Sequence, residues 1–327
     1  MSSLAVAVFA AESGEHLLAE PRNRRFERFR QTFDDEAYRR RLTDAGIAWV
    51  GRDEPAFPRR LRAIHDPPAG LFVRGNQPLA LDGTPTVAIV GARACSPYGS
   101  SVARRLAAEL AAAGVVVISG LARGVDGAAH RGALESGTTG AVLGCGIDRE
   151  YPRAHATLAA DITECGWVVS EYAPGVEPAP WRFPARNRIV AGLSDATVIV
   201  EARERSGALI TADLALDEGR EVLAVPGEIT SQLSVGSNHL LRLGATPVTC
   251  SGDVLQALGV RAPPRPPPQA LDARLDAIRA VVADAPTGAD EVVRRTGLDA
   301  ARVAAALAEL ELLGVIEQAD GLYSASP

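Results

Sequence analysis

From residue 84 to residue 260, short β-branched runs alternate with alanine-rich stretches of helical character. The runs predicted to be strands cover residues 86–90, 115–118, 139–143, 167–170, 196–201, 221–225 and 246–249. The predicted helices between them lie near 97–113, 125–136, 153–165, 185–192, 207–219 and 236–243. Apolar strands separated by helices form parallel sheets that are covered on both faces and bind ligands at the carboxyl ends of the strands. This segment is therefore predicted to be an α/β domain with a doubly wound, Rossmann-like parallel sheet.

Two further regions flank this domain, one on each side. Residues 1–83 contain helical pieces around 24–44 and are predicted to form a small, mainly helical N-terminal adjunct. The proline run at 261–268 can form neither a helix nor a sheet ladder, so it is predicted to be a semi-rigid linker. After it, helical patterns at 271–283, 288–296 and 299–313 and a hairpin near Asp320 and Gly321 predict a winged helix over 269–327.

The charge of the predicted winged helix is unusual for a reader of duplex DNA. Residues 269–327 hold five arginines against ten acidic residues, which gives a net charge of −5. A helix of this sign in a major groove would face phosphates unfavourably. We therefore predict that this domain is a protein-interaction or regulatory module, or a stabilising appendage.

Glycine-rich or polar turns follow almost every predicted strand of the central domain. The first turn, after residues 86–90, precedes a helix N-terminus, where free N–H groups suit a phosphate. Several such turns on one sheet edge form a crevice that phosphates or sugars can approach closely. The arginines of 183–192 add donors for phosphate recognition, or else form salt bridges with nearby acids. The candidate ligand-binding residues are Gly91, Arg93, Ser119, Gly120, Arg123, Arg186, Asn187, Arg188, Ser206 and Gly207.

Several functional classes are disfavoured by what the sequence lacks. The chain has no lysine, so it has no P-loop, and the first turn is not a G-x-G-x-x-G dinucleotide fingerprint. The four cysteines are far apart and the five histidines are scattered, so neither a metal site nor a hydrolytic set is indicated. His130 is expected to orient the loop at Asp126 or to cap its helix. We expect no cofactor and no catalytic residue.

The overall charge also constrains partners and location. With 34 basic and 40 acidic residues, the formal net charge is −6, which argues against broad adhesion to nucleic acid but permits a local basic pocket. No apolar run approaches the roughly 20 residues that span a bilayer, and no signal segment is evident. We therefore expect a cytoplasmic protein without a membrane partner.

Several blocks of this sequence together resemble one known family. They are Val87-Ala-Ile-Val-Gly-Ala-Arg93, Ser119-Gly-Leu-Ala-Arg-Gly-Val-Asp126, Ala129-His130, Ser170-Glu171, Phe183-Pro-Ala-Arg-Asn-Arg-Ile189, Ser206-Gly-Ala-Leu-Ile-Thr211, Val225-Pro-Gly227 and Gly236-Ser-Asn238. In this order, over about 55–260, they resemble DNA-processing protein A (DprA, also called Smf).

The resemblance implies a protein of natural transformation that binds and protects incoming single-stranded DNA. It also implies a homodimer that loads the RecA recombinase onto that strand, without catalysis. Carried over by motif, Arg93 would contact the strand, beside the Ser119–Gly120 turn and the Arg186–Arg188 segment. Tyr98 and Phe183 are candidates for base stacking, as are Tyr172 and Trp181. For self-association we expect 227–245, which holds apolar side chains such as Leu240, Leu241 and Leu243.

Two other functions remain to be weighed. A related Rossmann-like family cleaves nucleoside monophosphates and carries a P-G-G-x-G-T turn with a catalytic glutamate. The nearest counterpart here, Ser206–Thr211, lacks the paired glycines, which favours binding over hydrolysis. An NAD-dependent oxidoreductase is disfavoured by the missing fingerprint.

Overall fold

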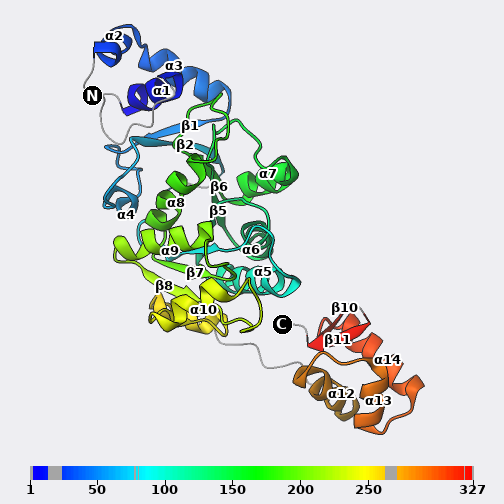
Figure 1. Ribbon diagram of the computed structural model, residues 1–327. Helices are drawn as coiled ribbons and strands as arrows, with labels where there is room; N and C mark the ends of the chain where they lie inside the picture. The colour runs from blue at the N-terminus through cyan, green and yellow to red at the C-terminus, as the bar shows by residue number, and fades with distance from the viewer. Residues whose placement is uncertain are drawn as a thin grey trace. The chain divides into compact units, whose positions relative to one another are not determined.

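The computed structural model describes residues 3–13, 24–76, 79, 81–261, 271–319 and 321–325. The chain divides into two compact units, Met1–Pro263 and Pro264–Pro327, which are considered separately below (Figure 1). Of the predicted linker, residues 262–268 lie outside the described residues. No helix in the described part of the chain is long and apolar enough to cross a membrane.

The larger unit is built on one sheet, which among the described residues has nine strands in the order β1-β2-β6-β5-β4-β3-β7-β8-β9. Strands β3 to β9 pair in parallel, as predicted. They are β3 (Thr86–Val90), β4 (Val116–Ser119), β5 (Thr139–Val142), β6 (Trp167–Ser170), β7 (Ala196–Ile199), β8 (Glu221–Ala224) and β9 (Thr246–Pro247). The chain runs outward from β3 on one side and returns to β7 on the other, so β3 marks the point at which ligands bind in doubly wound sheets.

Helices cover both faces of this sheet (Figure 1). On one face, Val87 and Ile89 of β3 pack with α5 (Pro97–Ala112), α6 (Val125–Leu134) and α11 (Ser251–Ala257). On the other, Ala88 and Val90 belong to a core shared with α8 (Arg182–Leu193), α9 (Gly207–Asp217) and α10 (Val235–Arg242). Successive strand residues point to opposite faces, so a β-branched run with no polar position suits a strand buried on both sides. A third core lies under α7 (Ala156–Cys165), which follows the short 3-10 helix η1 (Arg153–His155).

The N-terminal segment contributes both helices and strands to the larger unit. It does contain α1 (Ser3–Ser13), α2 (Arg24–Thr32), α3 (Asp35–Asp44) and the short α4 (Arg59–Arg62), but it also supplies β1 (Ala48–Gly51) and β2 (Gly70–Gly75). These strands extend the sheet in antiparallel fashion, with Phe72 opposite Ser170 of β6. Leu71 and Phe72 are fully buried, so their burial against the sheet decides their position. A boundary at residue 83 therefore does not separate two compact units.

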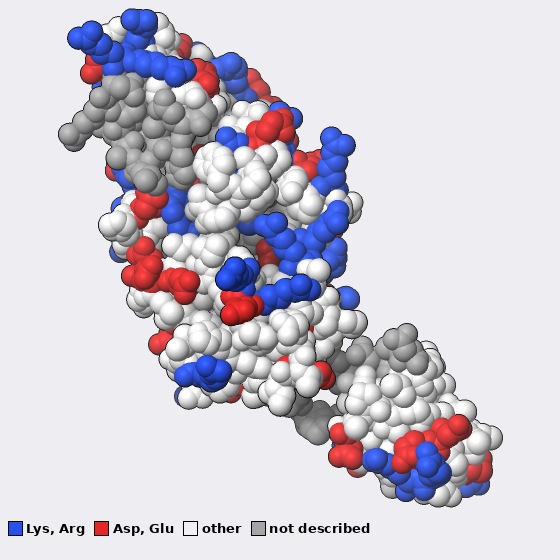
Figure 2. Space-filling model, in the orientation of Figure 1, with Lys and Arg blue, Asp and Glu red and all other residues white. Residues whose placement is uncertain are grey.

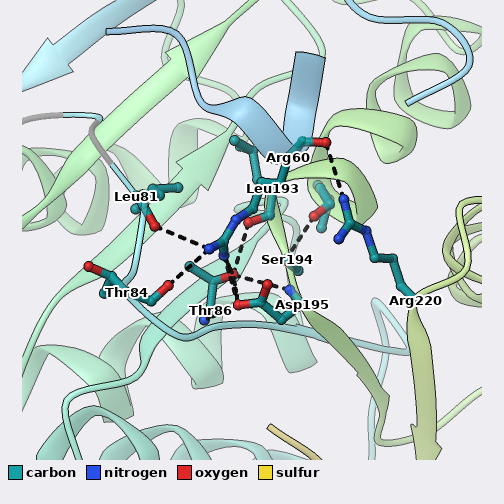
Figure 3. Close-up of polar contacts among 9 residues, drawn as sticks. Arg60, Leu81, Thr84, Thr86, Leu193, Ser194, Asp195 and Arg220 are labelled. Carbon is teal, nitrogen blue, oxygen red and sulfur yellow. Dashed lines mark hydrogen bonds and ion pairs between the residues drawn. The ribbon is translucent and has the colours of Figure 1, made fainter. Parts of the chain in front are cut away.

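A polar cluster joins α4 to the start of β3 and β7 (Figure 3). Arg60 donates to the Asp195 carboxylate at 2.8 Å, to the hydroxyl of Thr86, and to the carbonyl oxygens of Leu81 and Thr84, each at 3.1 Å. Asp195 also accepts from the Thr86 amide at 2.9 Å and from its hydroxyl at 3.0 Å. One guanidinium thus links three separate parts of the chain.

The smaller unit has the predicted winged-helix elements. They are α12 (Ala273–Asp284), α13 (Ala289–Thr296), α14 (Ala300–Leu312) and the antiparallel pair β10 (Ile316–Ala319) and β11 (Leu322–Ala325). Its own core includes the fully buried Ile278, Val303 and Leu310. Of the predicted turn residues, Gly321 lies between the two strands, whereas Asp320 lies outside the described residues.

Candidate nucleic-acid interface

A cavity of about 740 Å³ opens at the carboxyl ends of the central strands, around the point where the strand order reverses. Its walls come from the turns after β3, β4 and β7, from the first turns of α8 and α9, and from the loop after β5. The residues with functional side chains or turns are Gly91, Arg93, Gly120, Asp126, Tyr151, Phe183, Arg186, Asn187, Arg203, Arg205, Ser206 and Gly207. The predicted turns therefore do meet at one edge.

Three exposed arginines, Arg93, Arg203 and Arg205, give the cavity its positive charge. Within the described part of the chain, no carboxylate lies within ion-pair distance of any of them. Figure 2 shows basic side chains gathered toward the middle of the face that it presents of the larger unit. Guanidinium groups that are exposed and unpaired retain their donors for phosphate oxygens. Arg203 and Arg205 were not among the predicted residues, although their place directly after β7 is a signal that could have identified them.

The turn that carries Arg93 is held by two features. Glu201, buried at the end of β7, accepts from the Ser96 amide at 2.9 Å and from its hydroxyl at 2.5 Å. Ser96 in turn caps α5 by accepting from the Gly99 amide at 3.0 Å. The loop after β4 also packs against this turn, at Gly124, which has a φ of +76°. A Cβ at Gly124 would collide with the backbone of residues 92 and 93.

Gly91, at the end of β3, is closely packed against its neighbours. A Cβ at Gly91 would lie 2.7 Å from the Val125 side chain and 3.0 Å from the Glu201 carbonyl oxygen. The glycine is therefore required for close packing of β3 against α6 and β7, although it also lines the cavity. Its predicted part in ligand binding stays a prediction.

Arg186 is part of the cavity wall, and its Nη1 donors are bonded to two backbone carbonyl oxygens. Its side chain is 4% exposed and donates to the carbonyl oxygen of Gly120 at 2.7 Å and to that of Val142. The neighbouring Asp126 accepts from the amides of Gly120 at 3.1 Å and Ala122 at 3.2 Å. Burial raises the pKa of Asp126, opposed by Arg186, and burial lowers the pKa of Arg186, opposed by Asp126. Arg186 thus fixes the ends of β4 and β5.

Four other predicted residues lie outside the cavity. Arg188 is 12% exposed and forms salt bridges at 2.7 Å with both Glu171 and Asp66, so the salt-bridge alternative applies to it. Ser119 is fully buried and donates to the Ile89 carbonyl oxygen at 2.7 Å. Arg123 is exposed, but does not line the cavity. Tyr98 is exposed away from it and donates to the Pro226 carbonyl oxygen at 3.1 Å.

Aromatic side chains form one wall of the cavity. The Phe183 ring lies 5.2 Å from the Arg93 guanidinium carbon and 5.3 Å from the Tyr151 ring, at an interplanar angle of 30°. Tyr151 is 41% exposed. The sequence predicted Phe183 as a base-stacking residue but not Tyr151. The only sequence feature that points to Tyr151 is its position in the loop after a predicted strand.

His130 neither orients the Asp126 loop nor caps its helix. It is fully buried, and its Nδ1 lies 2.7 Å from the Thr139 hydroxyl. Because that hydroxyl donates to the Val117 carbonyl oxygen, Nδ1 carries the proton that completes the bond. Burial, with smaller contributions from nearby cations, lowers the pKa of His130 to about 3. It is a neutral core residue that links α6 to β5.

Sequence comparisons identify relatives along most of the chain. A family model described as DNA recombination-mediator protein A matches residues 48–259, and one described as DprA winged helix domain matches residues 262–321. DNA processing protein DprA of Streptococcus pneumoniae is 45% identical over 203 residues, covering 62% of this chain and 71% of the relative. Protein Smf of Escherichia coli is 39% identical over 307 residues, covering 88% and 82%.

Solved structures agree with these relatives. DNA processing protein A of Streptococcus pneumoniae superposes with a TM-score of 0.65 at 39% identity, covering 78% of this chain and 92% of that one. The Helicobacter pylori protein, described for its unique single-stranded DNA binding mode, gives a TM-score of 0.59 at 32% identity, with 65% and 95% covered. Because the first family model spans well over half of the sequence and the relatives are similar over most of their length, the chain belongs to the DprA/Smf family of DNA-processing proteins.

Proposed function

We propose that the cavity binds single-stranded DNA, with Arg93, Arg203 and Arg205 on the phosphates and the Phe183–Tyr151 wall against the bases. The observation that carries this proposal is the combination of unpaired guanidinium groups with two adjacent aromatic rings in one cavity. Single-strand sites combine a positive groove with rings on which bases stack. The exposed amide end of α9 at Gly207, where a Cβ would meet nothing within 4 Å, adds room for a phosphate.

Preference for single strands follows from the shape of the site. Bases can reach the Phe183 and Tyr151 rings only if they are unpaired and unstacked, because these rings line a concave wall. A duplex would present its backbone to the rim and leave the aromatic wall unused. The structure described for the Helicobacter pylori relative supports the same ligand class.

In the cell, we propose a role in natural transformation, with protection of incoming strands and loading of the RecA recombinase onto them. The family description as a recombination mediator supports this role. We further propose a cytoplasmic homodimer that acts without catalysis. The expected self-association segment 227–245 includes two strongly exposed apolar side chains, Ile229 at 95% and Leu243 at 71% exposure. Nucleoside-monophosphate cleavage remains the alternative, because a carboxyl group, Asp126, lines the cavity.

Fluorescence anisotropy with labelled single- and double-stranded oligonucleotides tests the proposal. Arg93→Ala is expected to weaken single-strand binding and to reduce the salt slope by about 0.7, the value for one lost phosphate contact on a single strand. Arg104→Ala is the matched control, since Arg104 is exposed and pairs with Glu135 outside the cavity. Equal losses in the two variants, or no preference for single strands, would refute the proposal. Release of free base from nucleoside monophosphates would favour the alternative.

A further inference from the structure

Helix α2 carries a strongly basic surface in the N-terminal part of the larger unit. Four of its nine residues are arginines, Arg24, Arg25, Arg28 and Arg30, against one acidic residue, Glu27. All four arginines are exposed. Figure 2 shows basic side chains gathered where Figure 1 places this helix. On a chain whose formal net charge is −6, this local excess of positive charge requires an explanation.

The opposite side of α2 is packed, and this packing fixes the direction of the arginines. Phe26 is 3% exposed, and its ring meets that of Phe9 edge to face with centroids 5.2 Å apart. The Phe29 ring lies 5.4 Å from the same Phe9 ring. Arg24 and Arg28 are four residues apart, so they lie one above the other on the side of the helix that faces away from these rings.

Arg24 and Arg28 are also the two arginines of α2 that have no partner. Within the described residues, neither side chain forms an ion pair or a hydrogen bond. Arg25 and Arg30 differ from them, because each makes a contact within the chain, which for Arg25 includes the Phe9 ring at 5.8 Å. Two guanidinium groups on one helical face thus keep all their donors for an anion outside the chain.

Stability of the helix does not explain this arrangement. The neighbouring helix α3 shows the usual one, in which Arg39 pairs with Asp35 one turn earlier at 2.8 Å. In α2, by contrast, Arg24 is followed four residues later by a second cation, Arg28. Like charges at this spacing destabilise a helix. A surface that is kept at a cost in stability indicates a binding function.

We propose that the Arg24–Arg28 face of α2 is a second DNA contact, separate from the cavity, which binds the phosphate backbone of the strand outside the cavity. The inference rests on the proposed function for the identity of that strand. Guanidinium groups on phosphates read no bases, so the contact would be independent of sequence and dependent on salt. Membership of a DNA-processing family favours DNA over an acidic protein as the polyanion.

The test measures the salt dependence of binding for two labelled single strands, one of about 4 nucleotides and one several times longer than the roughly 4–16 nucleotides of a single-strand site. The double variant is Arg24→Ala with Arg28→Ala. Its matched control is Arg40→Ala with Arg59→Ala, which removes the same charge from two exposed arginines that have carboxylate partners. On the long strand, the salt slope should fall by about 1.4 in the double variant, the value for two lost phosphate contacts, and stay unchanged in the control. The short strand, which we expect the cavity to hold alone, should bind both variants as it binds the wild type.

Urea unfolding separates a binding role from a structural one. Because like charges on one face oppose helix formation, the Arg24 and Arg28 double variant should unfold at the same urea concentration as the wild type or at a higher one. The inference is overturned if the long-strand salt slope of this variant equals that of the control, as an acidic protein partner on α2 would give, or if a lower slope comes with a lower urea midpoint. Failure of the proposed function looks different, since short-strand binding would then not depend on Arg93, whatever the α2 variants do.

Discussion

Replacing Arg60 by alanine is expected to destabilise the larger unit far more than replacing its neighbour Arg59. Both belong to the short helix α4, but their surroundings differ. The Arg60 side chain is 14% exposed and reaches into the cluster of Figure 3, whereas Arg59 is 83% exposed and pairs with Asp82 at the surface. The two variants therefore compare a structural ion pair with a solvated one on the same helical turn.

The size of the effect follows from the lost contacts. Removing one partner of a buried ion pair costs about 3–5 kcal/mol, but Asp195 is 35% exposed and keeps its bonds from Thr86, so solvent lowers that cost. The carbonyl oxygens of Leu81 and Thr84 also lose a charged donor, which contributes in the range of about 1.5–3 kcal/mol for such bonds. We expect Arg60→Ala to cost about 2–3 kcal/mol and Arg59→Ala about 0.5 kcal/mol or less.

Urea unfolding followed by tryptophan fluorescence measures this difference. All three tryptophans lie in the larger unit, so the signal does not include the winged helix. With an m-value of about 3 kcal/mol per molar urea, the midpoint should fall by about 0.7–1 M in Arg60→Ala and by less than about 0.2 M in Arg59→Ala. Similar midpoints in the two variants would show that the cluster does not fasten the N-terminal segment to the sheet.

Three further results are expected. The pKa of the buried His130 is about 3, whereas in the unfolded chain it is about 6.5. The free energy of unfolding should therefore fall by about 1.4 kcal/mol for each pH unit as the pH is lowered from about 6.5 to about 3. Urea midpoints of His130→Gln should lack this pH-dependent loss. Arg188→Ala should cost about 3 kcal/mol of stability, because Glu171 and Asp66 lose their partner, while single-strand affinity measured under folded conditions stays unchanged. The isolated fragment 264–327 should fold, as judged by circular dichroism, and fail to bind duplex DNA at physiological salt. A retarded duplex band would contradict the prediction that it is a protein-interaction or regulatory module, or a stabilising appendage.

The sheet could be predicted from sequence because its strands are signalled locally. A run such as Thr86–Val90, apolar or β-branched throughout and followed by glycine, leaves little choice but a buried strand. Strands β1 and β2 were missed because the turn-rich segment around them has no helix–strand alternation. Their position depends on burial of residues such as Trp49 and Phe72 against the core beneath α1 and α7, which is information from distant parts of the chain.

The position of the cavity could be predicted from the sequence better than the residues that line it. The strand-end turns do meet at one edge of the sheet, and Arg93 and Phe183 line the cavity there, while their part in DNA binding stays a prediction. The motif at residues 183–189 could not reveal that Arg186 donates to backbone carbonyl oxygens or that Arg188 pairs with carboxylates, because those partners come from other strands and loops. Helical spacing explains why only some residues of this motif line the cavity. Residues 183, 186 and 187 share one side of α8, which faces the cavity, whereas residue 188 lies on another side and pairs with carboxylates.

As far as the structure describes the chain, the cavity has three exposed arginines without an ion pair, which limits how much of the affinity electrostatics can supply. Three phosphate contacts, from Arg93, Arg203 and Arg205, correspond to a salt slope of about 2 for a single strand. On a chain with net charge −6, diffuse attraction adds little to this. Stacking contributes about 1–3 kcal/mol per base and depends weakly on salt, so the aromatic wall must supply much of the binding free energy. A shallow salt dependence combined with a strong preference for unpaired bases is therefore the signature that this cavity should give, and it would distinguish stacking on rings from simple phosphate attraction.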